Sequence, residues 1–418
     1  MNSKLNINYR LSIKIVLFFI LISIFTYTFY FSLTNIINYW SFTEFHINYN
    51  LGFSKRGLLG SLMLWLENLG IPKNIFFSTT FYLITLSNIF LFLNLLNRFK
   101  KNHLLFYIFF SLNPALLLFS FYDLGGYARG ESFGIFVCLL HVSFAQKLHE
   151  QKITYQRYLK FSFLIIFPIF MLTVLVHELN ILFLSFHIFT VFLIIKKNQF
   201  KKIANFKYLI ICNFIFIIFI VLLLITHPFT RNFAQELYNT LPNKNGTSFW
   251  ILDSIAGTFS ERINSEINHM LIPSGAINLY IYIFVFYITP IFFLLTKTTE
   301  KDRFYLIYIF LSVIPFFFLF FIGRDWGRWI HIIIFLIFFC LIQFKEKKMT
   351  IQKNLKSKIL MYTFVIFIIL QLLFTRIPHC CNLTRLNLNV IGGIIPKLEV
   401  FYKILNNKYD IEKRFEKY

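Results

Sequence analysis

Four short clusters of charged residues interrupt an otherwise apolar chain, and their residue types suit phosphate binding and proton transfer. They are Lys55-Arg56, the run Asp123 to Glu131, His177-Glu178 and the run Gly323 to Trp329. Guanidinium groups bind phosphate oxygens through paired hydrogen bonds. A carboxylate or a histidine can take the proton of an attacking hydroxyl group. Together the clusters predict a site that holds a phosphorylated ligand and deprotonates an acceptor.

The run Gly-Arg-Asp-Trp-Gly-Arg-Trp at 323–329 carries the most chemistry. Arg324 and Arg328 lie within five residues of each other, and the glycines let the backbone approach a ligand closely. Trp326 could stack on a sugar ring. The structural alternative is an aromatic belt at a membrane interface, with Asp325 pairing to a neighbouring arginine.

The other three clusters also have a functional and a structural explanation. Glu131 stands at the head of a predicted helix, close to Asp123 and Arg129, where it could be either a reactive carboxylate or an ordinary cap in a local salt bridge. His177-Glu178 could be a general base with a tuned pKa, or a hydrogen-bonded polar pair that links two helices. Lys55-Arg56 could bind a ligand, or could extend to the lipid headgroups.

Composition predicts an all-α, polytopic integral membrane protein. Hydrophobic residues make up 57% of the chain, charged residues only 14%, and apolar runs recur from end to end. The net charge of +23 comes from short basic patches between the apolar runs. Such patches are typical of cytoplasmic loops, so we expect membrane lipids and not nucleic acid as the partner of this charge.

The apolar runs predict about 11 transmembrane helices in a single domain over 1–376, followed by a polar tail over 377–418. Residues 57–69 are too few to cross and predict an interfacial helix after span 1. A long outer loop over 227–274, with helix-like periodicity in 249–270, separates spans 7 and 8. The predicted spans are about 12–33, 75–96, 103–121, 132–147, 161–176, 179–195, 207–226, 275–296, 303–322, 330–344 and 359–375.

The distribution of charge orients these spans. With the amino terminus inside, the inner segments carry 24 Lys and Arg residues against 4 Asp and Glu, and the outer segments before the tail carry 9 against 10. A bias of this size supports the arrangement, because one reversed span would invert all that follow. In this arrangement all four charged clusters lie on the same outer face, where intramembrane charge indicates function.

Several familiar chemistries lack their motifs. Walker, Rossmann, GxSxG and CxxC patterns are missing, and the histidine-glutamate pair at 177–178 lacks the second histidine of HExxH, so we expect neither a cofactor nor a metal. An outer compartment has no nucleotide supply, so an activated donor there must arrive on a membrane lipid. A polyprenyl-phosphate or polyprenyl-pyrophosphate sugar is such a donor.

The layout of spans, the loop over 227–274 and the run over 323–329, with less support from 52–60 and 123–131, resemble bacterial surface-polysaccharide repeat-unit polymerases of the Wzy type. The chain is also similar to the wider set of lipid-donor glycosyltransferases with the C-type membrane fold. The resemblance implies polymerisation of polyprenyl-pyrophosphate-linked oligosaccharide units of an O-antigen or capsule, without metal. C-type transferases typically carry an acidic residue in the first outer loop, and here that loop offers only Glu44. This departure argues against a simple monosaccharide transferase and favours the polymerase.

This interpretation gives each cluster a role. Arg129, Arg324 and Arg328 hold the pyrophosphate, with Lys55 and Arg56 as helpers, and Glu131 or Glu178, with His177, is the base. The substrate-binding residues are Lys55, Arg56, Asp123, Arg129, Arg324, Trp326 and Arg328, and the catalytic residues are Glu131, His177, Glu178 and Asp325.

The expected location is the bacterial inner membrane with the site facing the periplasm, and a chain-length regulator is an expected partner. Two alternatives stay open: a polyprenyl-phosphate-sugar-dependent C-type transferase, and a transporter or flippase of lipid-linked glycans. A membrane acyltransferase is a further class.

Overall fold

The structure, a computed structural model, describes residues 14–26, 39–97, 110–113, 115–119, 129–197, 206–241, 247–267, 276–296, 303–323 and 325–343, with single positions at 12, 29, 107, 362, 366 and 371. Within these residues the chain is helical and has no strand. Five helical segments in this part are long and apolar enough to cross a membrane, as expected of a multi-pass membrane protein. They are Lys73–Asn97, Tyr155–Val176, Glu178–Lys196, Lys207–Thr226 and Trp326–Gln343.

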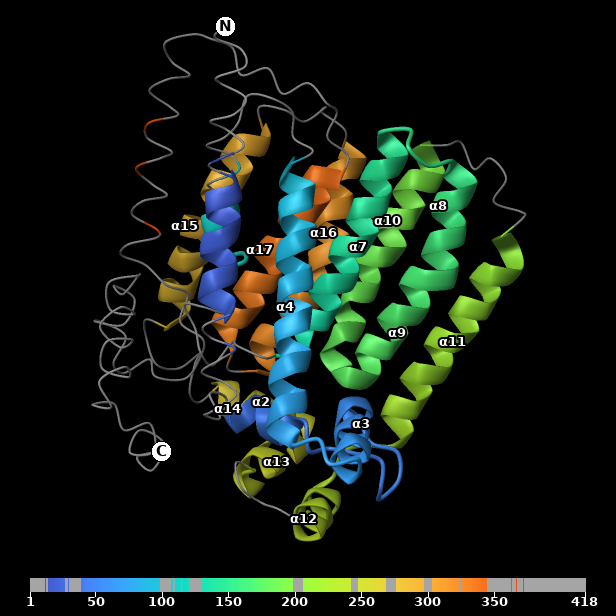
Figure 1. The fold of residues 1–418 in the computed structure, drawn as a ribbon, viewed down its shortest axis with the longest axis vertical. Coiled ribbons are helices and arrows are strands. Elements are labelled where there is room, and N and C mark those ends of the chain that lie inside the picture. Colours follow the sequence, from blue (N-terminus) through green and yellow to red (C-terminus); the bar gives the residue numbers. More distant parts are fainter. Residues whose placement is uncertain are drawn as a thin grey trace, which may run out of the picture.

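The helices run roughly side by side, and a group of short helices covers one end of the bundle (Figure 1). The elements that make up the bundle are α4 (Lys73–Asn97), α7 (Glu131–His149), α8 (Tyr155–Phe161), η2 (Ser162–Ile166), α9 (Phe167–Val176), η3 (Glu178–Phe183), α10 (Leu184–Lys197), α11 (Lys207–Thr226), α15 (Ala276–Thr296), α16 (Arg303–Phe317), η6 (Phe318–Phe321) and α17 (Trp326–Gln343). The short helices at the end are α2 (Tyr39–Glu44), α3 (Gly57–Asn68), α12 (Arg231–Thr240), α13 (Phe249–Ala256) and α14 (Phe259–Glu266).

Most predicted spans that fall on described residues coincide with helices. The prediction over 207–226 matches α11 residue for residue, and the interfacial helix predicted over 57–69 is α3. The spans predicted over 12–33 and 103–121 lie partly outside the described residues, the span over 359–375 lies largely outside them, and the polar tail lies wholly outside them.

The stretch 161–195 is divided into two helices at His177, as predicted. His177 has an extended backbone (φ −155°, ψ 116°) that ends α9 and starts η3. The Asn180 side chain fixes this break, because its amide donates to the carbonyls of Thr173 and Gly130 at 2.8 and 3.2 Å. The break therefore places His177 and Glu178 at the end of both helices, next to the start of α7.

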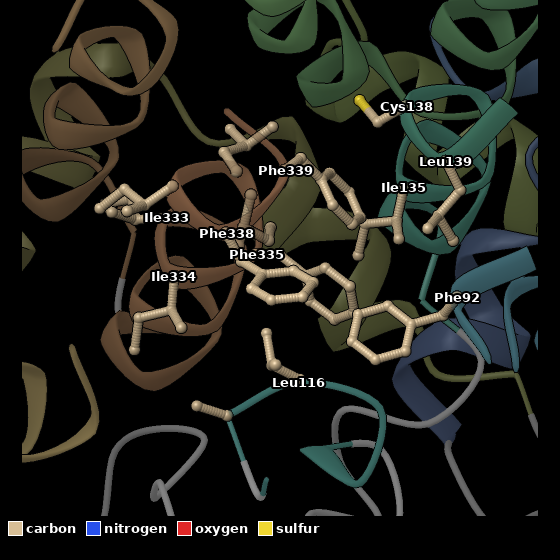
Figure 2. Close-up of a cluster of buried hydrophobic side chains, with 14 of the residues drawn as sticks. Phe92, Leu116, Ile135, Cys138, Leu139, Ile333, Ile334, Phe335, Phe338 and Phe339 are labelled. Atoms are coloured by element: carbon tan, nitrogen blue, oxygen red, sulfur yellow. The ribbon is translucent and has the colours of Figure 1, made fainter. Parts of the chain in front are cut away.

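Helix α17 is the centre of the bundle. Its residues are buried all round, because α7, α15 and α16 surround it. Phe338 packs against Phe92 of α4 with ring centroids 5.3 Å apart (Figure 2). A helix that is apolar on every side is stable only inside such a core. The span predicted over 330–344 started four residues too late: Trp326 begins the helix, so Arg328 lies in its first turn and not in a preceding loop.

The described part of the loop predicted over 227–274 forms a cap made of α12, α13 and α14. Helix α13 packs on α12 and on α2, and Leu237, Leu252 and Ile255 of the cap share a buried cluster with Ile47. The helical periodicity predicted over 249–270 resolves into two helices, because Thr258 starts α14 with a capping box closed by Glu261.

Candidate functional site

The charged clusters meet at the capped end of the bundle. Arg56 makes the closest contacts: its Nε and Nη2 donate to the two oxygens of Glu178 at 2.5 and 2.6 Å. Its Nη1 donates to Glu44 Oε1 at 2.6 Å. These bonds join the residue before α3 to η3 and α2, segments that lie up to 122 residues apart. Lys55 adds a longer contact, with Nζ 3.7 Å from Glu178 Oε1.

Glu131, in the first turn of α7, is the second meeting point. Arg328 Nη1 lies 3.5 Å from Glu131 Oε1, and His177 Nε2 lies 3.8 Å from the same oxygen. Arg328 is held from its other side by Asp325, at 2.6 Å. Glu131 is buried, yet neither of its oxygens accepts a hydrogen bond from another residue that the structure describes. Nearby cations therefore balance the charge of this carboxylate, while its oxygens can still accept hydrogen bonds.

Arg129 brings a second guanidinium to the same place. Its Nη1 lies 3.8 Å from Glu44 Oε1, and its guanidinium lies over the Trp40 ring at 5.8 Å from the centroid. Burial lowers the pKa of Arg129, and the nearby positive charge of Arg328 lowers it further. Two buried guanidiniums close enough to oppose each other's charge favour an anion between them.

We call these residues the charge cluster. Its described members are Lys55, Arg56, Arg129 and Arg328, the acids Glu44, Glu131, Glu178 and Asp325, and His177. Their contacts form two sets, one around Arg56 and one around Glu131. The two sets are neighbours along the chain at 129–131 and at 177–178. The numbers of cations and anions among them are equal, which is how so much charge stays buried next to an apolar core.

The histidine in the charge cluster is neutral and presents a proton to Glu131. Burial lowers the pKa of His177 below its ordinary value, although the carboxylate of Glu131 opposes this. His177 Nδ1 accepts the amide N–H of Leu179 at 3.3 Å. A neutral imidazole that accepts at Nδ1 carries its proton on Nε2, the nitrogen that faces Glu131. Burial would raise the pKa of Glu131, but the charge of Arg328 lowers it to about 2, so the carboxylate is ionised, the form that can accept a proton.

The arginine at the centre of the network is held as a permanent cation. Burial alone would lower the pKa of Arg56, but the carboxylates of Glu178 and Glu44 raise it above its ordinary value. Burial also lowers the pKa of Lys55, an effect that Glu178 opposes. Every guanidinium nitrogen of Arg56 already has a partner, so this side chain organises the site and has little capacity left for a ligand.

Two backbone features allow this close arrangement. Arg56 has a left-handed backbone (φ 67°, ψ 5°), a costly state for a residue with a side chain and one that concentrates at functional sites. Gly130 lies so close to the His177 ring that a Cβ atom there would overlap it. A glycine at 130 thus lets α7 and its Glu131 approach the break at His177.

The cleft of the site is narrow. Its walls leave no room for a water molecule in this conformation, and they are Glu44, Phe45, Arg56, Leu59, Gly130, Val176 and His177. A ligand of any size therefore requires these walls to separate.

The structure brings eight of the predicted site residues into the charge cluster: Lys55, Arg56, Arg129, Glu131, His177, Glu178, Asp325 and Arg328. Asp123 and Arg324 lie outside the described residues. The prediction that Trp326 offers its ring to a substrate is wrong in this conformation. Its side chain is 5% exposed and packs between Tyr280 and Phe320, with ring centroids at 5.4 and 5.3 Å. The reason is that the helix begins at Trp326 and turns this ring into the core.

Glu44 and Trp40 also belong to the site, although no role in the site was predicted for either residue from the sequence. Glu44 contacts Arg56 and Arg129, and Trp40 donates its Nε1 proton to Glu44 Oε1 at 2.6 Å. A carboxylate in a short, otherwise uncharged segment just before Lys55-Arg56 was the available signal. Within the described residues, no group of three or more His, Cys, Asp or Glu side chains is arranged to hold a metal ion.

Comparison of the chain with protein-family models, with curated proteins and with solved structures finds no match. The chemistry of the charge cluster therefore carries the functional argument. The cluster can hold an anion between Arg129 and Arg328 and can take a proton on Glu131.

Proposed function

We propose that this chain transfers glycosyl groups at the outer face of a bacterial inner membrane, and that it polymerises polyprenyl-pyrophosphate-linked oligosaccharide repeat units of an O-antigen or capsule. The proposal includes eleven membrane spans and a site that opens to the periplasm. It extends the resemblance to repeat-unit polymerases from the layout of spans to the residues of the charge cluster.

One observation carries the proposal: Arg328 and His177, from segments 151 residues apart, both face the carboxylate of Glu131. A basic group for a leaving phosphate and a proton acceptor for a hydroxyl are the two parts that glycosyl transfer from a lipid pyrophosphate requires. Here they stand within a few ångströms of each other.

In the proposed reaction, Glu131 takes the proton of an acceptor hydroxyl. The oxygen forms a bond to the anomeric carbon of the donor, and the bond between that carbon and the pyrophosphate oxygen breaks. The lipid pyrophosphate leaves with the electron pair, and Arg129 and Arg328 bind its negative charge. Asp325 positions Arg328, and His177 positions Glu131. Glu178 is a weaker base than Glu131, because Arg56 donates two hydrogen bonds to it.

A second candidate is a single-sugar transferase of the C-type fold that uses a polyprenyl-phosphate sugar. The position of Glu44 favours it, because an acidic residue of the first outer segment lies inside the charge cluster. The two candidates differ in their product. A polymerase lengthens a lipid-linked oligosaccharide by whole repeat units, whereas a single-sugar transferase adds one residue from a monophosphate donor.

The test is Arg328→Ala in cells that display long glycan chains. We expect surface glycans of a single repeat unit, with the protein still present in the membrane, because the leaving pyrophosphate loses its main cation. Arg328→Lys should give an intermediate chain length, since a lysine keeps the charge but not the two-pronged geometry.

Arg231→Ala is the matched control for this test. Arg231 is an exposed arginine of the cap, paired with Asp253 and Glu261 at 3.2 and 3.1 Å. This variant should keep the normal chain length. Long chains in Arg328→Ala cells, at a normal protein level, would remove Arg328 from the mechanism and the proposal with it.

A further inference from the structure

An exposed tryptophan on the cap lies next to the charge cluster. Trp250 of α13 is 66% exposed, although α13 buries Ile251, Leu252 and Ile255 against α2 and α12. The ring therefore stands on the face of α13 that points away from its own core. Most of this ring is therefore accessible to a ligand.

Trp250 is connected to the charge cluster through Trp40. The two rings make an edge-to-face contact, with centroids 5.8 Å apart and planes at 84°. Trp40 in turn donates to Glu44 Oε1 at 2.6 Å and carries the Arg129 guanidinium over its ring. A continuous path of two aromatic rings thus runs from the surface of the cap to a carboxylate and an arginine of the proposed site.

The aromatic pair is held in place by the backbone. The amide of Ser248, two residues before Trp250, donates to Thr43 Oγ1 at 3.1 Å, which ties the start of α13 to α2. The buried cluster shared by α13 and Ile47 adds apolar contacts to the same junction. A preformed platform of this kind binds a ligand without first ordering a loop.

The neighbours of Trp250 fit a polar ligand better than a lipid. One turn along α13, its neighbours are Asp253 and Ser254. Trp65 of α3 offers the contrast: it is 58% exposed, and one turn on either side lie the exposed apolar residues Leu62 and Leu69. An aromatic ring among apolar neighbours suits the membrane interface, whereas an aromatic ring beside carboxylate and hydroxyl groups suits a sugar.

We propose that Trp250 and Trp40 form the subsite for the acceptor saccharide, an inference that rests on the proposed function. A pyranose presents C–H groups on one face, and the negative face of an indole attracts them. The hydroxyl groups at the edge of the sugar donate hydrogen bonds, which a carboxylate can accept. Glu44 supplies such an acceptor, because it is buried and its Oε2 receives no hydrogen bond from a described residue. Stacking on Trp250 would place the terminal sugar beside Glu44 and Arg129.

The test uses the purified full chain in detergent. The probe is the lipid-linked oligosaccharide that accumulates in cells lacking this chain, and its sugar part released by mild acid. We expect Trp250→Ala to raise the KM for the lipid-linked oligosaccharide about tenfold with kcat nearly unchanged, the loss of one aromatic stacking contact. Trp250→Tyr should restore most of the affinity. Trp65→Ala is the matched control and should behave as the wild type.

Direct binding separates this inference from the proposed function. The released oligosaccharide should change the tryptophan emission of the wild type but not of Trp250→Ala, whether or not turnover occurs. A Trp250→Ala variant with the KM and emission change of the wild type would overturn the subsite, even if Arg328→Ala still abolishes polymerisation. Quenching of Trp250 by brominated lipids would also overturn it, because the ring would then be a membrane anchor.

Discussion

Two polar groups of residues lie inside this apolar bundle, and they are built differently. The charge cluster at the capped end contains four carboxylates and four cationic side chains among its described members. About three turns further along α7, in the interior of the helices, lies a neutral chain of side chains. There His141 Nδ1 is 2.9 Å from His187 Nδ1, and His141 Nε2 is 2.7 Å from the Tyr158 hydroxyl.

The two groups differ in how completely their hydrogen bonds are made. Both ring nitrogens of His141 have partners, and Cys138 Sγ lies 3.8 Å from the remaining nitrogen of His187. In the charge cluster, by contrast, both oxygens of Glu131, Oε2 of Glu44 and Nε of Arg328 lack a hydrogen-bond partner among the described residues. A polar chain with complete hydrogen bonds joins helices, whereas buried polar atoms without partners are costly and indicate a ligand.

The largest expected effect is on activity, from Glu131→Gln. The substitution keeps the size of the side chain but removes the proton acceptor. We expect the rate per folded molecule to fall about 10²- to 10⁴-fold, equivalent to about 3–5 kcal/mol of barrier. Rates on the lipid-linked oligosaccharide would measure this. Glu67→Gln on α3, where Glu67 pairs with Lys73 at 3.1 Å, is the matched control. An undiminished rate for Glu131→Gln would show that another group is the base.

The next effect is on stability, from Arg56→Ala. This change leaves two carboxylates without the cation that compensates them, and it should lower the free energy of unfolding by about 3–5 kcal/mol. Chemical denaturation in detergent would measure it. Lys55→Ala is the control, because its ammonium is 3.7 Å from Glu178 and its side chain is 20% exposed; its loss should cost less than about 1 kcal/mol. Equal losses for the two variants would contradict the central role of Arg56.

The smallest effect tests the neutral chain. His141→Phe removes the partner of both His187 and Tyr158 without opening a large cavity. We expect a total loss of about 1–3 kcal/mol, because buried polar groups are left without a hydrogen bond. Polymerisation per folded molecule should not change, because the chain lies outside the proposed site. Loss of activity in a His141→Phe protein of normal stability would bring this chain into the mechanism and end the contrast between the two groups.

Much of the helical architecture follows from the sequence. The length of an apolar run and its basic flanks are local properties, so α11 was predicted to the residue, and the break at His177 followed from a 35-residue stretch that is too long for one span. The same lengths predicted that the four charged clusters share one face. Helix ends were less predictable: Trp326 starts α17 because packing against Tyr280 and Phe320 favours helix there.

The sequence by itself predicted that the four charged clusters lie at one end of a helical membrane bundle, because the lengths of the apolar runs and their basic flanks set where each cluster falls. Only the tertiary structure decided which charges meet. Arg56 joins Glu44 and Glu178 rather than a ligand, Glu131 faces Arg328 and His177, and Trp40 meets Trp250 of the cap. Hydrophobic periodicity encodes which face of a helix is buried, but it carries no information about which neighbour lies across that face. Packing of whole helices supplies that information.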